Sequence, residues 1–421
     1  MKILQIVHGF PPESVGGTEL YCQAVARELA SRGHASLVLA GTKESRHASE
    51  LVTVDQDGLM VTRLVGTLSV PDHWSPSSRP GAERLMRGYL AEARPDVVHV
   101  QHWPRLTSNL VVIYKSMRIP TVATLHDLWA TCPRGNRLRW DRVFCTDPLP
   151  TAPCLSCVVR KEGEPDEEVA RELGLRQRVI AEELRQADRV LIPSEAQKAF
   201  LARLLPGDGA RLQVLPHGTI RRLIPASSHD DGSTGPLRVG YWGSLAWWKG
   251  PHLLLEAFRS LPDPSMVEAH LFGLPADAEY GTQLKSLAAG LAVVFHGRFL
   301  PTDLHRTGLQ LAVFPSLCHE SHSFVLDEAF QLGLPAIVPE RGAPASRIGT
   351  AGLTFKTGDA RDLARQIRRV LEEPGLLERL RKGKPAAPPV SLEIHAGHLE
   401  AIYRQVIGAA DVARSAVEGR W

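Results

Sequence analysis

Residues 1–40 read MKILQIVHGF PPESVGGTEL YCQAVARELA SRGHASLVLA, and this stretch decides the fold class. Lys2 to Val7 is a short apolar run that favours a buried strand. After a loop rich in glycine and proline, apolar residues recur at helical spacing from Leu20 to Leu29, and Gly33 suits the end of that helix. Ser36 to Ala40 is a second apolar run. The order strand, loop, helix, strand predicts a βαβ unit and therefore a parallel sheet.

The same alternation continues along the chain. Further buried strands are predicted at 96–101, 121–125 and 189–194, and a second series of strands and helices begins near Leu237. The segment VTVDQDGLMVTRL alternates in polarity around Asp57-Gly58, so it predicts a hairpin in preference to an Asp-x-Asp metal motif.

A chain of 421 residues is too long for one hydrophobic core. We therefore expect an α/β protein with two doubly wound, Rossmann-like domains. The first domain is placed at 1–208, with a cysteine-rich insert at 131–160, and the second at 209–388. A helix within 389–421 is expected to pack back on the first domain.

The composition narrows the class of protein. Lys and Arg total 49 against 46 Asp and Glu, and this balance argues against a nucleic-acid binder. No run of about 18 apolar residues occurs, so no transmembrane segment is expected. The apolar run at Lys2 to Val7 is too short for a signal peptide, which favours a cytoplasmic protein.

Two places in the second half carry candidate binding residues. In GSLAWWKG (243–250), Lys249 follows a strand and precedes a helix, where a lysine beside free backbone N–H groups suits a diphosphate. Taken alone, a solvated lysine is the more common explanation of such a segment. In ESHSFVLDEAFQLGLP (320–335), Glu320 and Glu328 suit sugar hydroxyls, while a helix-terminal acid and a solvated acid explain them equally well.

Taken together, these segments resemble the family 4 retaining glycosyltransferases of GT-B fold, the glycosyl transferases group 1, in a subgroup with a four-cysteine insert. The motifs VGGTE, GSLAWWKG, ESHSFVLDE and Gly333-Leu334-Pro335 occur in the family's order. The resemblance implies two domains that face each other across a cleft.

The resemblance also implies roles for individual residues. Lys249 would contact the donor diphosphate, Glu328 the ribose, and Glu320 the hydroxyls of the transferred sugar. His126 would lie near the anomeric carbon, so His126, Lys249 and Glu320 are the candidate catalytic residues. The other candidate donor-binding residues are Gly16, Gly17, Ser244, Arg298, Ser323, Phe324 and Val325. Ser244 stands where many members have arginine, and Ser323 where many have glycine.

The implied reaction is sugar transfer from a nucleotide-sugar donor of UDP, GDP or dTDP type, with retention of the anomeric configuration. The leaving phosphate would take the acceptor's proton, and no metal or other cofactor would be needed for catalysis. The acceptor would be a sugar, a lipid-linked molecule or a natural product, as in bacterial biosynthesis. The alternatives are a nucleotide-sugar-binding protein without transfer activity and a nucleotide-sugar epimerase of GT-B fold.

Four cysteines form the spacing C-x12-C-x8-C-x2-C, at Cys132, Cys145, Cys154 and Cys157. A structural zinc site is our first interpretation, with unligated thiols, disulfides or a cluster as open alternatives. Because the insert follows His126 directly, we also hypothesise that it shapes the acceptor pocket. The separate Cys22 and Cys318 fit small buried hydrophobic positions.

Overall fold

The computed structural model describes residues 1–418 except 45, 47, 67–78, 150, 161–162, 206, 208 and 224–234. The described chain forms two compact units. The first unit comprises Met1–Trp140, Cys145–Ile220 and Val390–Trp421, and the second comprises Asp141–Phe144 and Arg221–Pro389. The main part of the second unit begins after Ile220. The boundary expected at 208 lies at a residue outside the described set.

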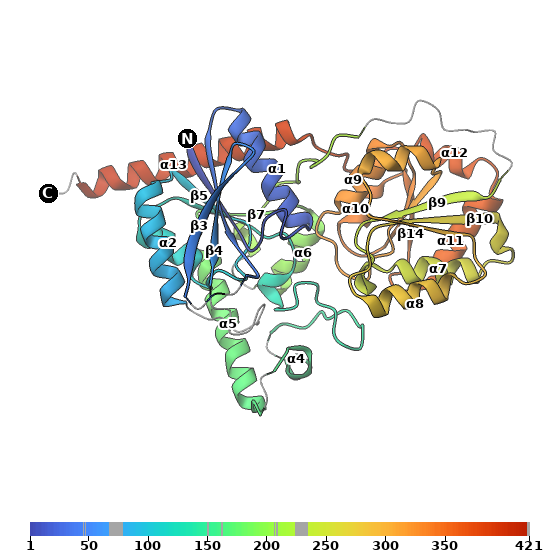
Figure 1. Ribbon diagram of the computed structural model, residues 1–421, viewed down its shortest axis with the longest axis horizontal. Helices are drawn as coiled ribbons and strands as arrows, with labels where there is room; N and C mark the ends of the chain where they lie inside the picture. Colours follow the sequence, from blue (N-terminus) through green and yellow to red (C-terminus); the bar gives the residue numbers. More distant parts are fainter. Residues whose placement is uncertain are drawn as a thin grey trace. The chain divides into compact units, whose positions relative to one another are not determined.

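The first unit is built on an eight-stranded sheet with the order β3-β4-β2-β1-β5-β6-β7-β8 (Figure 1). All described pairs are parallel except β3 with β4. The antiparallel pair is the hairpin predicted around Asp57-Gly58, and both turn residues have positive φ. The strands are β1 (Lys2–Val7), β2 (Ala35–Gly41), β3 (Glu50–Gln56), β4 (Leu59–Val65), β5 (Val97–Val100), β6 (Thr121–Thr124), β7 (Arg189–Ile192) and β8 (Leu212–Val214).

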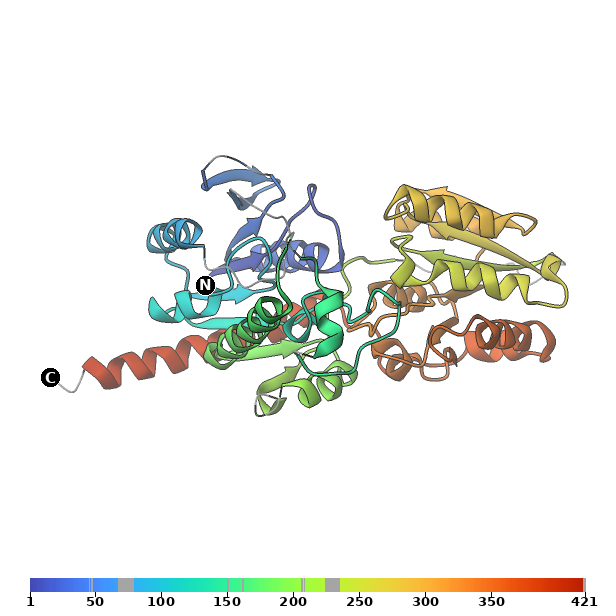
Figure 2. The ribbon, with the colours of Figure 1, turned by 90° about the horizontal axis from the view of Figure 1, so that it is seen from below.

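The first unit's sheet is covered by helices whose apolar stripes face it. In α1, Tyr21, Cys22, Val25 and Leu29 are buried at helical spacing. The C-terminal α13 runs back along this unit (Figures 1 and 2), and its His395 lies 2.6 Å from the Tyr21 hydroxyl. The helices are α1 (Gly17–Ser31), α2 (Pro80–Ala93), α3 (Leu110–Ser116), η1 (Trp129–Thr131), α4 (Ala152–Cys157), α5 (Asp166–Gln186), α6 (Glu195–Leu204), η2 (Gly209–Arg211) and α13 (Leu392–Glu418).

The second unit has a six-stranded parallel sheet with the order β11-β10-β9-β12-β13-β14. Numbered from its first strand, this is the order 3-2-1-4-5-6 of doubly wound folds, whose direction reverses between β9 and β12. The strands are β9 (Leu237–Trp242), β10 (Val267–Phe272), β11 (Val293–Gly297), β12 (Leu311–Val313), β13 (Ala336–Pro339) and β14 (Gly352–Phe355).

Side chains from alternate positions of these strands pack into two separate cores. Tyr241 packs with residues of α7, α8 and α11, while its neighbour Trp242 packs with residues of α9. Figure 1 shows α7 and α8 on one side of the sheet and α9 on the other. The helices are η3 (Trp247–Lys249), α7 (Pro251–Arg259), η4 (Pro264–Met266), α8 (Ala278–Ala288), η5 (Pro301–Thr307), α9 (Phe324–Gln331), α10 (Ala343–Ile348), α11 (Ala360–Glu372) and α12 (Leu376–Arg381).

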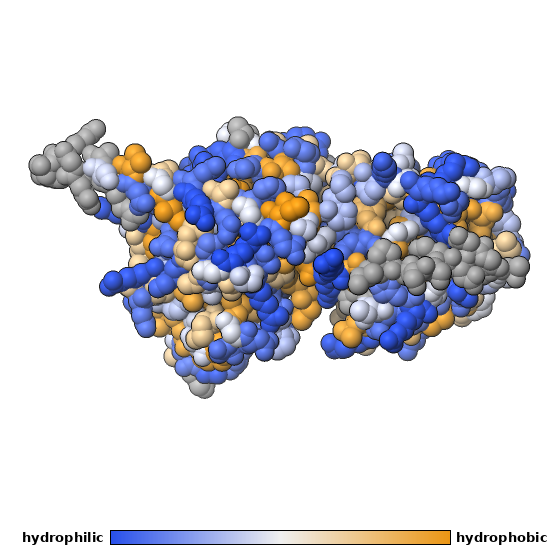
Figure 3. Space-filling model, turned by 90° about the horizontal axis from the view of Figure 1, so that it is seen from above, coloured by the Kyte–Doolittle hydropathy of each residue, from blue (hydrophilic) through white to orange (hydrophobic). Residues whose placement is uncertain are grey.

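The two parallel-sheet units confirm the predicted fold class. On the face shown in Figure 3, hydrophobic residues are scattered among hydrophilic ones on each unit, as is usual for a protein surface. Among the described residues, no helix is both long and apolar enough to cross a membrane. The cytoplasmic location stays a prediction.

Candidate active site

Lys249 and Glu320 form an ion pair at the switch point of the second sheet. Lys249 ends η3, just after β9, and Glu320 lies in the loop after β12. The Lys249 Nζ donates to Glu320 Oε1 at 2.7 Å, and the Ser316 hydroxyl donates to the same oxygen at 2.7 Å. Two residues that are 71 positions apart in sequence therefore meet where a doubly wound sheet binds its ligand.

The charges of this pair stabilise each other. Burial by itself would raise the pKa of Glu320, but the ammonium group of Lys249 holds it below its ordinary value. Burial by itself would lower the pKa of Lys249, but the Glu320 carboxylate holds it above its ordinary value. Both groups are therefore charged at neutral pH, and the lysine can offer a positive charge to an anionic ligand.

Backbone contacts hold the two loops together. Leu317 N donates to Trp248 O at 2.9 Å. Gly250 has φ of +74°, and a Cβ at this position would lie 2.0 Å from the carbonyl oxygen of Pro315. Only glycine therefore allows the chain after Lys249 to pass this close to the end of β12.

Glu328 lies in α9 with protein partners on both oxygens. Trp242 Nε1 donates to one oxygen at 2.8 Å and Arg221 Nη1 to the other at 3.2 Å, and the residue is 3% exposed. Burial raises the pKa of Glu328, and Arg221 opposes this rise. Each carboxylate oxygen has a second lone pair, so the group can still accept a hydroxyl hydrogen bond. Sequence reasoning assigned no role to Arg221 or Trp242, because neither belongs to the recognised motifs.

Ser323 precedes α9 with φ of +75°, a left-handed conformation that glycine adopts without strain. This backbone conformation explains why a glycine suits the same position in the family that the sequence resembles. Phe324 and Val325 follow as the first residues of the helix, and the N-terminus of a helix is a position that suits an anion.

A buried triad fixes the loop that carries Glu320. His322 Nε2 lies 2.7 Å from Asp327 Oδ2, and Arg347 forms an ion pair with the other oxygen of Asp327. Arg347 Nη1 also donates to His322 O at 2.9 Å. All three residues are buried, and nothing in the sequence analysis singled them out.

The remaining donor-site candidates of the second unit lie apart from this ion pair. Arg298 follows β11 at the sheet edge and is exposed. It makes no hydrogen bond or ion pair with another residue that the structure describes. Ser244 is exposed after β9, and its carbonyl oxygen accepts from the Tyr241 hydroxyl at 2.7 Å.

In the first unit, His126 lies directly after the end of β6 in a buried polar network. Its Nε2 lies 2.6 Å from Gln101 Oε1 and its Nδ1 lies 3.1 Å from His217 Nε2. Burial lowers the pKa of His126, so the ring is neutral, and the carbonyl oxygen of Gln101 favours the tautomer with hydrogen on Nε2.

This network reaches the C-terminal helix. Gln101 Nε2 donates to Gln5 Oε1 at 2.8 Å, and Gln5 Nε2 to the Tyr403 hydroxyl at 3.4 Å. The same hydroxyl lies 2.6 Å from His99 Nδ1. Tyr403 of α13 therefore belongs to the chain of hydrogen bonds that ends at His126.

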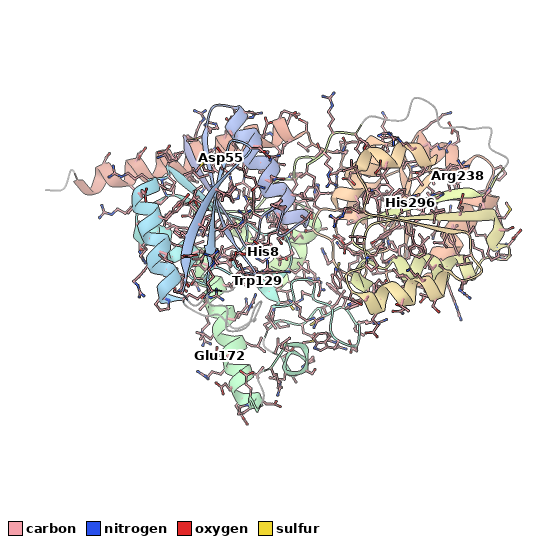
Figure 4. All side chains as sticks on the ribbon, in the orientation of Figure 1. His8, Asp55, Trp129, Glu172, Arg238 and His296 are labelled. Carbon is pink, nitrogen blue, oxygen red and sulfur yellow. The ribbon has the colours of Figure 1, made fainter. Side chains whose placement is uncertain are left out.

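Gly16 and Gly17 begin α1 in the loop after β1. Glu19 shapes this loop, since Ser14 donates to it at 2.7 Å and His8 Nε2 lies 3.3 Å away. Figure 4 labels His8 and also Trp129 of η1, and the ring of His102 contacts both of their rings. A Cβ on Gly16 would meet the Glu19 carboxylate at 2.7 Å, so a larger residue there would displace the Glu19 side chain.

Cys132, Cys145, Cys154 and Cys157 all line one pocket of the first unit, and all four are free. In the described part of the chain, no three His, Cys, Asp or Glu side chains lie close enough together to hold a metal ion. The zinc assignment therefore stays a prediction.

Two parallel-sheet units, with an ion pair at the switch point of the second, define a glycosyltransferase of GT-B type. Residues 15–220 match Glycosyltransferase Family 4, and residues 236–373 match Glycosyl transferases group 1. The chain belongs to this glycosyltransferase family.

Two curated relatives illustrate the likeness in sequence. The chain is 31% identical over 248 residues to a D-inositol 3-phosphate glycosyltransferase of Streptomyces bingchenggensis, and the alignment covers 53% of this chain and 52% of that enzyme. It is 24% identical over 408 residues to a glycogen synthase of Mycobacterium tuberculosis, covering 90% and 88%. The chain thus spans about half of the first relative and most of the second.

Solved structures share the fold at low sequence identity. Sucrose-phosphate synthase from Thermosynechococcus elongatus superposes with a TM-score of 0.66 at 19% identity, covering 97% of this chain and all of that one. Anabaena HepE in complex with UDP-glucose superposes with a TM-score of 0.61 at 16% identity, covering 98% of this chain and all of that one.

Proposed function

We propose that the protein transfers a sugar from a nucleotide-sugar donor to an acceptor with retention of the anomeric configuration. The observation that carries this proposal is the Lys249–Glu320 ion pair at the point between β9 and β12 where the strand order reverses. A bound donor would place its diphosphate beside Lys249 and its sugar hydroxyls beside Glu320. The cation and the hydrogen-bond acceptor that such a donor needs are then adjacent.

The residues around the pair have matching roles in this proposal. The lysine charge and the first N–H groups of α9, at Phe324 and Val325, stabilise the charge that develops on the leaving phosphate. Glu328 accepts from the ribose hydroxyls while Trp242 and Arg221 hold it in place. His126 is the first unit's contribution to the reaction.

In the reaction, the bond from the anomeric carbon to the phosphate oxygen breaks while a bond to the acceptor oxygen forms on the same face. The proton of the acceptor hydroxyl passes to the leaving phosphate. The positive charge in this scheme comes from Lys249 and the helix N-terminus, so the scheme includes no metal ion.

Ser244 stands where many members of the family have an arginine beside the donor diphosphate. Because Ser244 carries no charge, a protein that binds the donor without transferring its sugar is the second candidate. A UDP-sugar is the first donor to test, since the HepE structure contains UDP-glucose. A sugar is the first acceptor class to test.

The test has two stages. The first measures the thermal shift of the protein with UDP-, GDP- and dTDP-sugars, because a true donor stabilises the native state. The second follows transfer to sugar acceptors with and without EDTA, and determines the anomeric configuration of the product by NMR. Binding without transfer or hydrolysis favours the second candidate. An inverted product contradicts the proposal. Loss of activity in EDTA that added Mg²⁺ or Mn²⁺ restores, and that added Zn²⁺ does not, contradicts its metal-free part.

A further inference from the structure

The four cysteines of the insert come from separate stretches of chain that surround one small pocket. Cys132 follows η1, Cys145 donates its N–H to Arg137 O at 2.8 Å, and Cys154 and Cys157 belong to α4. All four line the same cavity of about 20 Å³. A cavity of this size holds one water molecule or one ion, and it is too small for an organic ligand.

Arginines gather around this cavity, and the carboxylate of Asp127 interacts electrostatically with one of them, Arg176. Arg134 and Arg137 line the cavity, and Arg176 and Arg137 are each 1% exposed. No carboxylate among the described residues forms an ion pair with any of the three. A buried guanidinium normally has an anionic partner, because burying an unpaired charge is costly.

The hydrogen bonds of these arginines go to backbone oxygens and not to carboxylates. Arg137 donates to the backbone oxygens of Cys145 and Thr131 and approaches Cys145 Sγ at 3.7 Å. Arg176 donates to Trp129 O, while its Nε and Nη1 have no hydrogen-bond partner. The Nε of Arg134 also has none. An anionic group at this cavity would give Arg137 a charged partner, and the sulfur of Cys145 already lies 3.7 Å from its guanidinium group.

The insert has little regular structure of its own. Between Thr131 and Ala152 the described residues form no helix or strand. The apolar cluster beneath α4 has only four buried members, namely Cys154, Val158, Val169 and Leu173. A segment of this length without regular structure needs another constraint to adopt one conformation.

We infer that Cys132, Cys145, Cys154 and Cys157 bind one tetrahedral Zn²⁺ as four thiolates. Four thiolates around one Zn²⁺ leave a net double negative charge beside the buried guanidinium groups of Arg137 and Arg176, of which Arg176 also has Asp127 nearby. Neither protonated thiols nor disulfides carry charge, so neither alternative offers Arg137 an anionic partner. Metal binding draws the sulfurs from the cavity walls to the Zn–S distance of about 2.3 Å.

The zinc site would order the chain that follows His126. Leu128 N donates to Gly135 O at 3.0 Å, and Trp129 N donates to Asp127 Oδ1 at 2.8 Å. The start of the insert is therefore tied by hydrogen bonds to the segment directly after His126. Loss of the metal would release Cys132 and loosen this segment, although none of these residues belongs to the donor site of the second unit.

The experiment uses the full chain, purified without chelator, and measures zinc per chain. The chain is then exchanged into Co²⁺, whose absorption spectrum reports tetrahedral coordination and thiolate ligation. We expect about one metal per chain, intense thiolate-to-cobalt bands, and protection of four thiols until the metal is removed. Cys157→Ala should lose at least tenfold in metal affinity, whereas the control Cys22→Ala, which alters a core cysteine away from the pocket, should keep it.

Two outcomes would overturn the inference. One is a metal-free chain with reactive thiols at all four positions, and the other is a metal-free chain in which these cysteines are joined by disulfides. Because the zinc content and the cobalt spectrum are measured on the unmodified chain, the result holds even where Cys157→Ala does not fold.

Discussion

Replacing Lys249 with methionine removes one charge but keeps an unbranched side chain that fills the same space. The variant leaves Glu320 with only the hydroxyl of Ser316 and weak sulfur contacts. A buried charge that loses its partner costs about 3–5 kcal/mol. Solvent reaches this pair, since the Lys249 side chain is 37% exposed, so we expect a smaller loss of about 1–2 kcal/mol in the free energy of unfolding.

The loss should depend on pH with a defined sign. In the native chain, Lys249 lowers the pKa of Glu320, so the pair contributes stability above about pH 4.3, the pKa of an unfolded glutamate. This contribution disappears as the pH falls through the folded-state pKa. In the variant, burial raises the pKa of Glu320 and only the hydrogen bonds from Ser316 and Cys318 oppose this rise. The difference in stability between the two proteins is therefore full at pH 7 and shrinks toward pH 4.

Donor binding gives the second readout of the same variant. A charge-assisted hydrogen bond to a diphosphate contributes about 1.5–3 kcal/mol, so the Kd of the donor should rise about 10- to 150-fold. Calorimetric titration measures the Kd, and urea unfolding at pH 7 and 4 measures the stability. Lys285→Ala, which changes an exposed lysine on α8, is the matched control.

A double variant separates the two effects. Lys249→Met with Glu320→Gln removes both charges, so it should be more stable at pH 7 than Lys249→Met alone. An equal stability loss at pH 4 and pH 7, together with an unchanged donor Kd, would refute both the coupling and the donor role of Lys249.

Three further substitutions test the surroundings of the site. Asp327→Asn leaves Arg347 buried without a carboxylate and should cost about 3 kcal/mol in urea unfolding. The matched control Asp359→Asn, at the N-cap of α11, should cost less than about 0.5 kcal/mol because asparagine caps a helix as well as aspartate. Gly250→Ala forces a left-handed backbone and a contact with Pro315 O, and should cost at least about 2 kcal/mol; a loss below 0.5 kcal/mol, measured the same way, would contradict the observed turn. Tyr403→Phe removes the hydroxyl between Gln5 and His99 and should lower kcat about 3- to 10-fold with little change in donor KM. An unchanged kcat and an unchanged pH profile would show that this hydroxyl is only structural.

The elements of the fold could be predicted because the apolar periodicity is strong. The helix expected around Leu20 to Leu29 is α1 at Gly17–Ser31, and the hairpin at Asp57-Gly58 has the predicted turn. Asp55, labelled in Figure 4, serves this turn, since its carboxylate accepts from Gly58 N at 2.7 Å. These features depend on neighbours in sequence, which is why the sequence alone indicates them.

The partners of the candidate site residues were not predictable, because they come from distant segments. Glu328 is bonded to Arg221 across 107 positions, and His99 to Tyr403 across 304. None of these partners has a motif that marks it. Polar residues on buried strands, such as Gln5 and His99, were a usable signal, since a buried polar side chain requires a hydrogen-bond partner.

The strand order explains why some expected donor-site residues meet and one does not. Lys249 and Glu320 follow β9 and β12, which are neighbours on either side of the switch point, so their loops meet at the same edge. Arg298 follows β11, and β10 separates that strand from β9. At about 4.8 Å per strand, Arg298 starts roughly 10 Å from the loop of Lys249. The long side chain of Arg298 could span much of that distance toward a bound donor. Direct contact between Arg298 and the Lys249–Glu320 ion pair would be expected only if β11 lay next to β9. Arg298 can therefore act only through contact with the bound donor. The variant Arg298→Ala should raise the Kd of the donor and leave the free energy of unfolding of the free protein unchanged within about 0.5 kcal/mol.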